Sequence, residues 1–465
     1  MSPTRVAVPA SISRKASMAR GRIAAAVLAL FATPSAFALD PGEDGVRVTI
    51  PVSALDDTAY AVAVDPAGNL VMAGTDAGAR SILASITRTG AMNGAFGTGG
   101  IAIHDLATTQ GDALRALVRM PDGRYVGCGQ FFNTGGSATD FAAARFMSDG
   151  SLDATFDGVG YVVTPFALSG AGGSLYDQCN AVAVQADGSV VSAGYTSEAG
   201  PPHVGVTRHT ASGQLDTSFG TGGRLDINAG ATSNGSSEAR AVLIQPDGKI
   251  LIAGYATGQF NDEFLVMRLD TDGSLDDGFG SLGVARTGVG TGEDIANAMV
   301  LQPDGRIVLA GSAVAADGRR DFALVRYLAD GSLDASFGTG GIVTTPVGPG
   351  DDIARSLVRM PWGRLVAGGS ARISTSAGGQ DLALVAYNAD GTLDRYFGDL
   401  GTRRVNVSAV TTADDVAYGL AVDLDGQHFW AVGTATPVST ADFMAIEFGL
   451  PDTIFRHGFD SNTAP

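Results

Sequence analysis

The amino-acid sequence predicts an all-β protein, a seven-bladed β-propeller with four antiparallel strands per blade. Two repeated signatures predict this fold. A Phe inside a Gly-rich motif recurs at steps of 60, 63, 60, 58 and 60 residues, at Phe96, Phe156, Phe219, Phe279, Phe337 and Phe397. A Pro-Asp-Gly-like turn recurs seven times, with its glycine at Gly68, Gly123, Gly188, Gly248, Gly305, Gly363 and Gly426. Together they indicate seven structural units.

Each unit contains four short apolar runs, here called strands A to D in chain order. In the fifth unit they are residues 297–302, 306–311, 321–327 and 341–345. The runs are rich in Val, Ile, Leu and Phe and are bounded by Gly, Asp and Pro, which is typical of strands. The Pro-Asp-Gly turn joins A to B as a hairpin, because its glycine can take a positive φ. Four strands in each of seven units favour a propeller over a solenoid.

The Phe-containing motif connects strand C to strand D. In the fifth unit it reads GSLDASFGTGGIVTT, residues 331–345. Its glycines are expected to form tight turns, and Asp334 to accept hydrogen bonds from neighbouring backbone N–H groups. Leu333 and Phe337 are expected to fill the seam between blades. The repetition of this motif therefore has a structural explanation.

The two ends of the repeat region indicate how the ring closes. A lone D-type strand, GVRVTI at 45–50, precedes the first strand A, and the last unit stops after its strand C, DFMAIEF at 442–448. One N-terminal and three C-terminal strands would complete the seventh blade and remove an exposed edge. We expect a single monomeric propeller domain over 45–448 and a short flexible C-terminal tail over 449–465.

The first 38 residues have the pattern of a secretory signal peptide. Four basic residues at positions 14–22 precede the apolar run 23–38, which ends in Ala-Phe-Ala. That run is shorter than the roughly 20 residues that span a bilayer. The sequence therefore predicts an exported protein, in the periplasm, at the cell surface or extracellular, without a transmembrane segment.

The chain is acidic, with a formal charge of −18. Without residues 1–38 it holds 25 Lys and Arg against 48 Asp and Glu, a formal charge of −23. Such a surface repels nucleic acid and anionic lipid. Nucleic acid is therefore not an expected partner, and the expected ligand is a protein, a peptide or a glycan.

The stretch PDGRIVLAG…DFALVRYLADGSLDASFGTGGIV, residues 303–343, resembles the delta-60 repeat family. That family consists of tandem units of ~60 residues in bacterial, mostly secreted or envelope proteins, and is grouped with β-propellers. The resemblance covers about 45–448. The first unit departs from it by reading GAMNGAFG, and Trp362 replaces the turn Asp of the sixth unit. The resemblance implies a propeller fold and implies no established enzymatic activity.

Signatures of common catalytic sites are missing from the sequence. There is no H-E-x-x-H, G-x-S-x-G or G-x-x-x-x-G-K-S/T pattern. Trp362 lies in an A–B turn and Trp430 in a strand B, so neither predicts a sugar platform. The histidines fall at unrelated positions of the repeat and predict neither a metal site nor a triad: His104, His203, His209, His428 and His457.

Calcium is the one cofactor that the sequence leaves open. Asp270, Asp272 and Asp276 alternate along residues 270–277, as calcium loops require, but Gly and Ser displace the third carboxylate from the register of such a loop. An Asp-Gly turn is the favoured interpretation, and no cofactor is expected.

One set of polar residues stands out when the seven units are stacked. Eleven residues before each turn glycine, at the start of strand A, stand Asp57, Asp112, Asp177, Ser237, Asp294, Asp352 and Asp415. Three residues later stand Tyr60, Arg115, Asn180, Arg240, Asn297, Arg355 and Tyr418, each followed by Ala, Ser or Gly. Because strand A should be innermost, both sets are a candidate binding site at one mouth of the channel. The alternative is that each Asp caps its own turn or pairs with an Arg of the next blade.

The loops indicate which face of the propeller binds a ligand. The A–B and C–D turns share one face and are nearly invariant, whereas the B–C and D–A loops share the other face and vary in length. The site is therefore expected on this variable face. Its predicted centre comprises Asp112, Arg115, Asp177, Asn180 and the long loops around Phe131, Phe132 and Tyr176.

Cys128 and Cys179 are the only cysteines. They are expected on the same face of adjacent blades, and export permits a disulfide between them. Two separate buried thiols are the alternative.

The predicted function is that of a non-catalytic, secreted or envelope binding module. One alternative is a propeller hydrolase or lactonase that uses mouth carboxylates and a divalent cation, and another is a purely structural envelope component. In the enzyme, two or more acids should converge on one metal at about 2.3–2.6 Å. In the binding module, the acids should be paired with Arg or with the backbone.

Overall fold

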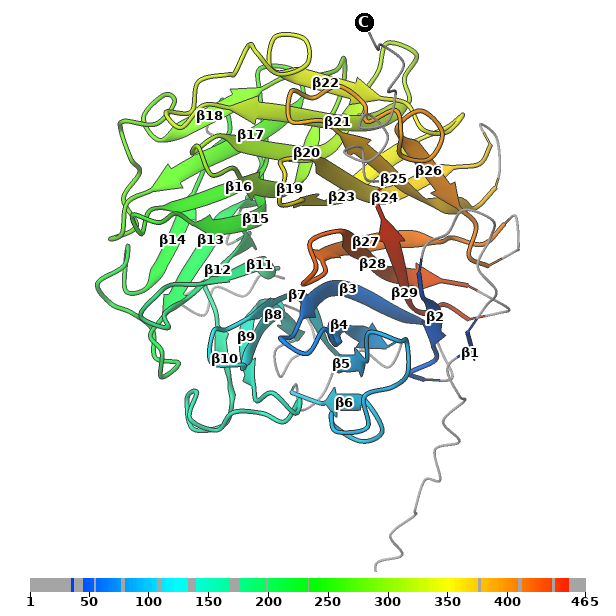
Figure 1. Cartoon of the computed structure of the whole chain (residues 1–465). Helices are drawn as coiled ribbons and strands as arrows, with labels where there is room; N and C mark the ends of the chain where they lie inside the picture. The colour runs from blue at the N-terminus through cyan, green and yellow to red at the C-terminus, as the bar shows by residue number, and fades with distance from the viewer. Residues whose placement is uncertain are drawn as a thin grey trace, which may run out of the picture. The chain divides into compact units, whose positions relative to one another are not determined.

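A computed structural model describes residues 35–36 and 45–450, apart from 54–55, 77–79, 107–110, 133–138, 167–175, 198–199, 233, 375–377, 409–411 and 437–439. The described residues form 29 β-strands in seven antiparallel sheets (Figure 1). This confirms the seven-bladed propeller with four antiparallel strands per blade. In the described part of the chain, no helix has the length and apolar character needed to cross a membrane.

Six blades are built from consecutive strands. Blade 1 contains β3 (Asp57–Val64), β4 (Leu70–Asp76), β5 (Ser81–Ile86) and β6 (Ile101–His104), and blade 2 contains β7 (Asp112–Arg119), β8 (Tyr125–Phe132), β9 (Thr139–Phe146) and β10 (Tyr161–Thr164). Blade 3 contains β11 (Gln178–Val184), β12 (Val190–Thr196), β13 (His203–His209) and β14 (Arg224–Ile227), and blade 4 contains β15 (Ser237–Ile244), β16 (Ile250–Thr257), β17 (Asp262–Leu269) and β18 (Val284–Thr287). Blade 5 contains β19 (Ile295–Leu301), β20 (Ile307–Val314), β21 (Arg320–Tyr327) and β22 (Ile342–Thr345), and blade 6 contains β23 (Asp352–Arg359), β24 (Leu365–Arg372), β25 (Gln380–Tyr387) and β26 (Thr402–Val405).

The seventh sheet combines strands from both ends of the chain. Its order is β1 (Ser35–Ala36), β2 (Arg47–Ile50), β29 (Asp442–Gly449), β28 (His428–Ala435) and β27 (Val416–Val422). β2 pairs antiparallel with β29, from Arg47 opposite Ile446 to Ile50 opposite Phe443. The two-residue β1 adds a fifth strand outside β2.

The first strand of each blade lies innermost, around the axis of the ring (Figure 1). Each of these strands contacts the first strand of the next blade, and β27 of blade 7 contacts β3 of blade 1. Strand A of every unit is therefore the strand whose side chains can reach the axis.

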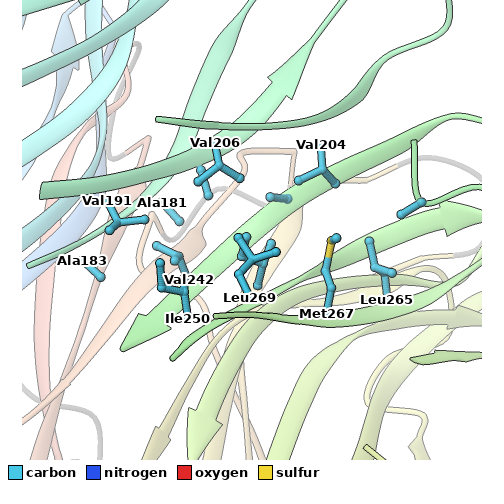
Figure 2. Close-up of a cluster of buried hydrophobic side chains, with 14 of the residues drawn as sticks. Ala181, Ala183, Val191, Val204, Val206, Val242, Ile250, Leu265, Met267 and Leu269 are labelled. Carbon is cyan, nitrogen blue, oxygen red and sulfur yellow. The ribbon is translucent and has the colours of Figure 1, made fainter. Parts of the chain in front are cut away.

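Apolar side chains fill the space between neighbouring blades. Between blades 3 and 4, Val204 and Val206 of β13 face Ile250 and Leu265, and all four are fully buried (Figure 2). Each such side chain contributes roughly 1.5–3 kcal/mol relative to an exposed one. Similar clusters recur around the ring. The alternation of apolar residues along each strand thus serves inter-blade packing.

The repeated C–D motif ties each blade to the next one. In blade 5, Arg326 Nε donates to Asp334 Oδ2 at 2.7 Å, and its Nη1 donates to the carbonyl of Ala389 in blade 6 at 2.5 Å. The guanidinium lies 4.5 Å from the ring centroid of Phe337, which is fully buried in the seam as expected. Leu333 does not fill the seam, because 38 % of it remains exposed.

The glycine of the motif permits this close approach. Gly391 of blade 6 has φ +88°, and a Cβ there would come within 2.9 Å of the Phe337 ring. Only glycine adopts this conformation without strain and leaves space for the ring.

The same Arg–Asp–Phe arrangement recurs in blades 2, 3 and 4. The Arg–Asp pairs, with Nε–Oδ2 distances of 2.6–2.7 Å, are Arg145–Asp153, Arg208–Asp216 and Arg268–Asp276. In blade 6 the strand C arginine is replaced by Ala386, and Asp394 pairs with Arg364 instead. The repetition of the motif is therefore explained by the seam between blades.

Cys128 and Cys179 form a disulfide. Cys128 lies in β8 of blade 2 and Cys179 in β11 of blade 3, with their Cα atoms 5.9 Å apart. The bond therefore crosslinks two neighbouring blades.

Candidate functional site

The acidic residues at the start of strand A do not line the channel. All six are at most 2 % exposed, and each accepts at least one hydrogen bond from a backbone N–H group of its own D–A loop. In blade 5, Asp294 Oδ2 receives Val289 N at 2.6 Å and Gly290 N at 2.8 Å. In blade 6, Asp352 Oδ2 receives two N–H groups in the same way. The caps are made by Asp57, Asp112, Asp177, Asp294, Asp352 and Asp415.

The fourth blade uses a hydroxyl for the same purpose. Ser237 Oγ receives the N–H of Ala229 at 3.2 Å and donates to the carbonyl of Ile227 at 3.3 Å. The alternative raised by the sequence, in which these residues cap their own loops, is therefore the arrangement in the structure.

Burial changes the acidity of these carboxyl groups. Loss of solvent raises the pKa of five of them, and the backbone hydrogen bonds act in the opposite direction. Those five are Asp57, Asp112, Asp177, Asp294 and Asp352. Carboxylates that are buried and hydrogen-bonded in separate blades are not arranged to hold one ion. Within the described ranges, no three His, Cys, Asp or Glu side chains converge as metal ligands.

The residues three positions later do reach the axis, because every strand A contains a β-bulge. In blade 4, Ala239 pairs with Gly254 and Ala241 with Ala253, so that Arg240 has no partner on β16. A bulge leaves one residue outside the ladder and redirects its side chain. The seven bulge residues are Tyr60, Arg115, Asn180, Arg240, Asn297, Arg355 and Tyr418.

The alternation of apolar residues along strand A does not reveal the bulges, but the glycines of strand B do. Opposite each bulge, strand B carries a glycine, and a Cβ there would lie 1.7–1.9 Å from a strand A carbonyl oxygen. A glycine inside a strand often marks a bulge or a close backbone approach. The seven are Gly74, Gly129, Gly194, Gly254, Gly311, Gly369 and Gly433.

The seven bulge residues, here called the axial ring, line a cavity of about 520 Å³ on the axis. A second, apolar layer lies two residues further along strand A and includes Val242, Met299 and Leu357. The innermost strands that carry both layers surround the centre of Figure 1. The cavity therefore joins a polar layer to an apolar one.

Aromatic contacts hold one side of the axial ring. Tyr60 and Tyr418 meet edge to face with their centroids 5.2 Å apart. Arg115 lies 5.1 Å from the Tyr60 centroid, and Arg355 lies 5.1 Å from that of Tyr418. Arg355, Tyr418, Tyr60 and Arg115, from blades 6, 7, 1 and 2, thus form one continuous row of contacts.

Hydrogen bonds hold the other side. Asn180 Nδ2 donates to the carbonyl of Ala239 at 2.9 Å, and Asn297 Nδ2 donates to that of Ala354 at 2.8 Å. Each bond reaches from one blade to the next. Arg240, which stands between the two asparagines, pairs with Glu238 at 2.8 Å. Burial and the Glu238 carboxylate raise the pKa of Tyr255, which lies beside this pair.

The variable loops are only partly described. The expected aromatic residue Phe131 is 2 % exposed and packs against Tyr161, so it belongs to the core and not to a binding surface. Phe132 is half-buried at the end of β8, and Tyr176 is 48 % exposed. The long segments beside them, 133–138 and 167–175, lie outside the described residues.

The acidic turn 270–277 is occupied by protein groups. Asp276 Oδ2 receives Lys249 Nζ at 2.7 Å and Arg268 Nε at 2.6 Å. These bonds, with that of Lys249 foremost, lower the pKa of Asp276 to about 2. Asp270 also pairs with Lys249, and Asp272 accepts two hydrogen bonds from Ser274. The segment has the contacts of an Asp-Gly turn.

The histidines and tryptophans lie apart from the cavity. Each of the four described histidines bonds to its own separate partner: His104 to Gly150, His203 to Asp226, His209 to Thr164 and His428 to Asp425. His457 lies outside the described residues. Trp430 is fully buried, and Trp362 is exposed in its turn.

One family model matches five of the repeats. Five segments match a family described as "Domain of unknown function (DUF5122) beta-propeller", at residues 121–156, 185–219, 245–279, 302–337 and 363–397. Each begins near a Pro-Asp-Gly turn and ends at the Phe of the C–D motif. These matches support a β-propeller repeat family. No curated protein matches the chain.

Several solved structures match most of this chain at low sequence identity. A polysaccharide lyase, Uly1, has 10 % identity and a TM-score of 0.43, with 84 % of this chain and 90 % of that chain covered. Sqt1 from Chaetomium thermophilum, bound to the N-terminus of ribosomal protein L10, has 12 % identity, a TM-score of 0.42 and coverage of 85 % and 97 %. A puromycin hydrolase has 15 % identity, a TM-score of 0.40 and coverage of 88 % and 60 %. Likeness at this level carries no inference about activity.

Proposed function

We propose that this protein is a non-catalytic binding module and that its ligand enters the axial cavity. We also propose that it is exported, as the N-terminal pattern indicates, and that its repeats are of the delta-60 type. The bulged axial ring is the observation that carries the binding proposal.

The axial ring differs in character from the positions that surround it. The Asp three positions before it is nearly constant and caps the D–A loop, and the residue directly after it is always small. The ring position itself holds Arg, Asn or Tyr in different blades. Each of the seven bulges turns a polar side chain towards the same cavity. Bulges are common beside functional sites, so this arrangement favours a role in binding over a role in stability alone. This supports a recognition surface made of unlike donors and acceptors.

The chemistry of the lining favours binding over hydrolysis. A hydrolase or lactonase needs a general acid or base, or ligands for a cation, beside its substrate. The described lining offers guanidinium, amide and phenol groups, whereas the strand A carboxylates are engaged by loop N–H groups. The residues that the enzyme alternative relies on are thus the loop caps.

The position of the ring also supports ligand entry from the variable face. In β15, Arg240 lies three residues after the first residue of the strand and four before the last, so the ring is slightly nearer to the D–A and B–C loops than to the A–B turns. Loops that vary within a repeated scaffold usually carry its specificity.

A ligand screen with cavity variants tests this proposal. Sugars, short peptides and small organic acids are screened by thermal shift against residues 39–465. Asn297→Ala and Tyr418→Ala should each weaken any binding ligand at least about tenfold, or ~1.4 kcal/mol. Trp362→Ala, on the opposite face, is the matched control and should leave affinity unchanged. A ligand that tolerates both cavity variants, or the absence of any binding ligand at millimolar concentration, would contradict an axial site.

A further inference from the structure

Three of the seven axial-ring residues are arginines, and they are spread around the axis. Arg115, Arg240 and Arg355 come from blades 2, 4 and 6. Around the ring, one Asn stands between Arg115 and Arg240 and another between Arg240 and Arg355. The Tyr60–Tyr418 pair stands between Arg355 and Arg115. The positive charges therefore surround the cavity on three sides and do not gather on one wall.

The contacts of these arginines leave their N–H edges available. Arg115 and Arg355 are stacked against tyrosine rings, which use the flat face of a guanidinium. A guanidinium hydrogen-bonds through its edge, with five N–H donors in a fixed plane. The Nε–H groups of all three arginines are buried without a hydrogen-bond partner among the described residues. Stacking thus holds Arg115 and Arg355 in place without using their donors, whereas Arg240 uses one donor in its pair with Glu238.

The charge around the cavity is unbalanced. Glu238 pairs with Arg240, and no other carboxylate of the described chain forms a salt bridge with the three arginines. Elsewhere the pattern is different, because the seam arginines all pair with Asp. Burial lowers the pKa of Arg355, and the charge of Arg240 acts in the same direction, while Tyr418 and Asp414 act against it. A protein with a formal charge of −18 therefore encloses a positive cavity.

We propose that the axial ring binds a small multivalent oxyanion, a molecule with two or more carboxylate or phosphate groups. The inference rests on the proposed axial binding site and names its ligand class. Guanidinium edges match the geometry of both oxyanions. Arginines on three sides favour a ligand with several anionic groups over a single carboxylate. The apolar layer of Val242, Met299 and Leu357 below the ring is suited to the uncharged part of the ligand.

Titration calorimetry at pH 7 and constant ionic strength tests the proposal with two probes. Citrate represents carboxylates and pyrophosphate represents phosphates, while acetate and glycerol serve as monovalent and neutral controls. At least one polyanion should bind with a Kd below about 1 mM and at least about tenfold more tightly than acetate. The probe that binds identifies the preferred oxyanion.

Variants then locate the site. Arg355→Gln and Arg240→Gln should each weaken the bound probe at least about tenfold, and Arg355→Lys should weaken it less, because charge is kept and the planar fork is lost. Arg359→Gln is the matched control, because it is on the same strand but four residues beyond Arg355, where it lines a second cavity that adjoins the axial cavity at the apolar residues Met299 and Leu357. It should leave affinity unchanged. Arg355→Gln should still melt cooperatively in the absence of polyanion, and this shows that the variant is folded.

Two results would overturn the proposal. One is that neither citrate nor pyrophosphate gives binding heat or a thermal shift at a concentration of about 10 mM, tenfold above the expected Kd. The other is unchanged polyanion binding in the Arg115→Gln/Arg240→Gln/Arg355→Gln variant. If a neutral ligand then binds and is lost in Asn297→Ala, the axial site stands and only its anionic character is wrong. If no ligand binds, both proposals are wrong.

Discussion

At the start of strand A, one position stabilises the fold, and the position three residues later is free to bind a ligand. Asp294 is buried and receives two loop N–H groups, whereas Asn297, three residues later, reaches the cavity. The same division holds for Asp352 and Arg355 in blade 6. A charge at the first position is compensated by hydrogen bonds, and a charge at the second is exposed to whatever enters the channel. Substitution of Asp112 or Asp177 should therefore act on stability first.

The carboxyl group of Asp442 should make the stability of the protein depend on pH. Asp442 begins β29 and is 9 % exposed. Burial, with the nearby carboxylates of Asp57 and Asp56, raises its pKa to about 6. Because the folded pKa exceeds the unfolded one, the folded protein binds more protons between about pH 4 and 6. The free energy of unfolding should therefore fall as pH rises through this window.

Asp442→Asn should remove this part of the pH dependence. We expect the variant to be more stable than the parent by about 1 kcal/mol at pH 7, and the difference to shrink towards pH 4. Urea unfolding at pH 4, 5, 6 and 7 measures it. Asp304→Asn, at an exposed carboxyl whose pKa is lowered beside Arg306, is the control and should not stabilise the protein at pH 7. An Asp442→Asn variant that is less stable than the parent at pH 7 would show that the carboxylate is not repelled.

Among the elements of the fold, the A–B hairpin determines the cavity. Its turn is a Pro-Asp-Gly type, its first strand carries the cap and the bulge, and its second strand carries the glycine that the bulge requires. A one-residue shift in register moves a side chain to the other face of a sheet. The hairpin therefore places the cap in the blade and the bulge residue on the axis.

Gly254→Ala should disturb the bulge of blade 4. An added Cβ would lie 1.9 Å from the carbonyl oxygen of Glu238, so the two strands must separate. We expect a loss of about 1–3 kcal/mol in the free energy of unfolding. Gly94→Ala is the control, because no atom lies within 4 Å of a Cβ there, and it should change stability by less than about 0.5 kcal/mol. Equal stability of both variants would contradict the close packing at the bulge.

The disulfide between blades 2 and 3 should stabilise that seam. It closes a segment of 51 residues, and in the chain-entropy account such a crosslink contributes up to about 4 kcal/mol. The Cys128→Ala/Cys179→Ala variant should therefore unfold at a lower denaturant concentration than the oxidised parent. Mass spectrometry of the unreduced protein checks the bond itself, since two free thiols would contradict it. The reduced parent provides a second comparison without a change of sequence.

In the whole molecule, the terminal strands meet in one sheet. β2 pairs with β29, although the two lie at opposite ends of the repeat region. Val48 and Ile50 are at most 2 % exposed, and Arg47 donates to the carbonyl of Val407 at 2.7 Å. These contacts join the N-terminal segment to blades 6 and 7.

Deletion of residues 39–53 should weaken the entire ring. The loss of Val48, Ile50 and Val52 from the core corresponds to roughly 5 kcal/mol, and β29 would be left with an unpaired edge. We expect a lower unfolding midpoint and aggregation at high concentration. A variant without residues 451–465 serves as the control and should melt like the parent. If the protein without 39–53 melted cooperatively at the parental temperature, β2 would not be needed for the stability of the ring.

The sequence by itself determined the number of units, the four strands of each and the turns that join them. These features depend on local patterns, such as apolar alternation, turn glycines and a motif repeated at a constant spacing. It also located the seven axial positions of the candidate site, Tyr60, Arg115, Asn180, Arg240, Asn297, Arg355 and Tyr418. Only the tertiary structure decided that the preceding carboxylates are caps, that Phe131 is buried and that the two cysteines are bonded. For the carboxylates the physical reason is the bulge: one unpaired residue in each strand A changes which side chains face the axis, and that shift is set by pairing with strand B rather than by the alternation of strand A. For Phe131 and the cysteines the reason is contact with residues far away in the sequence.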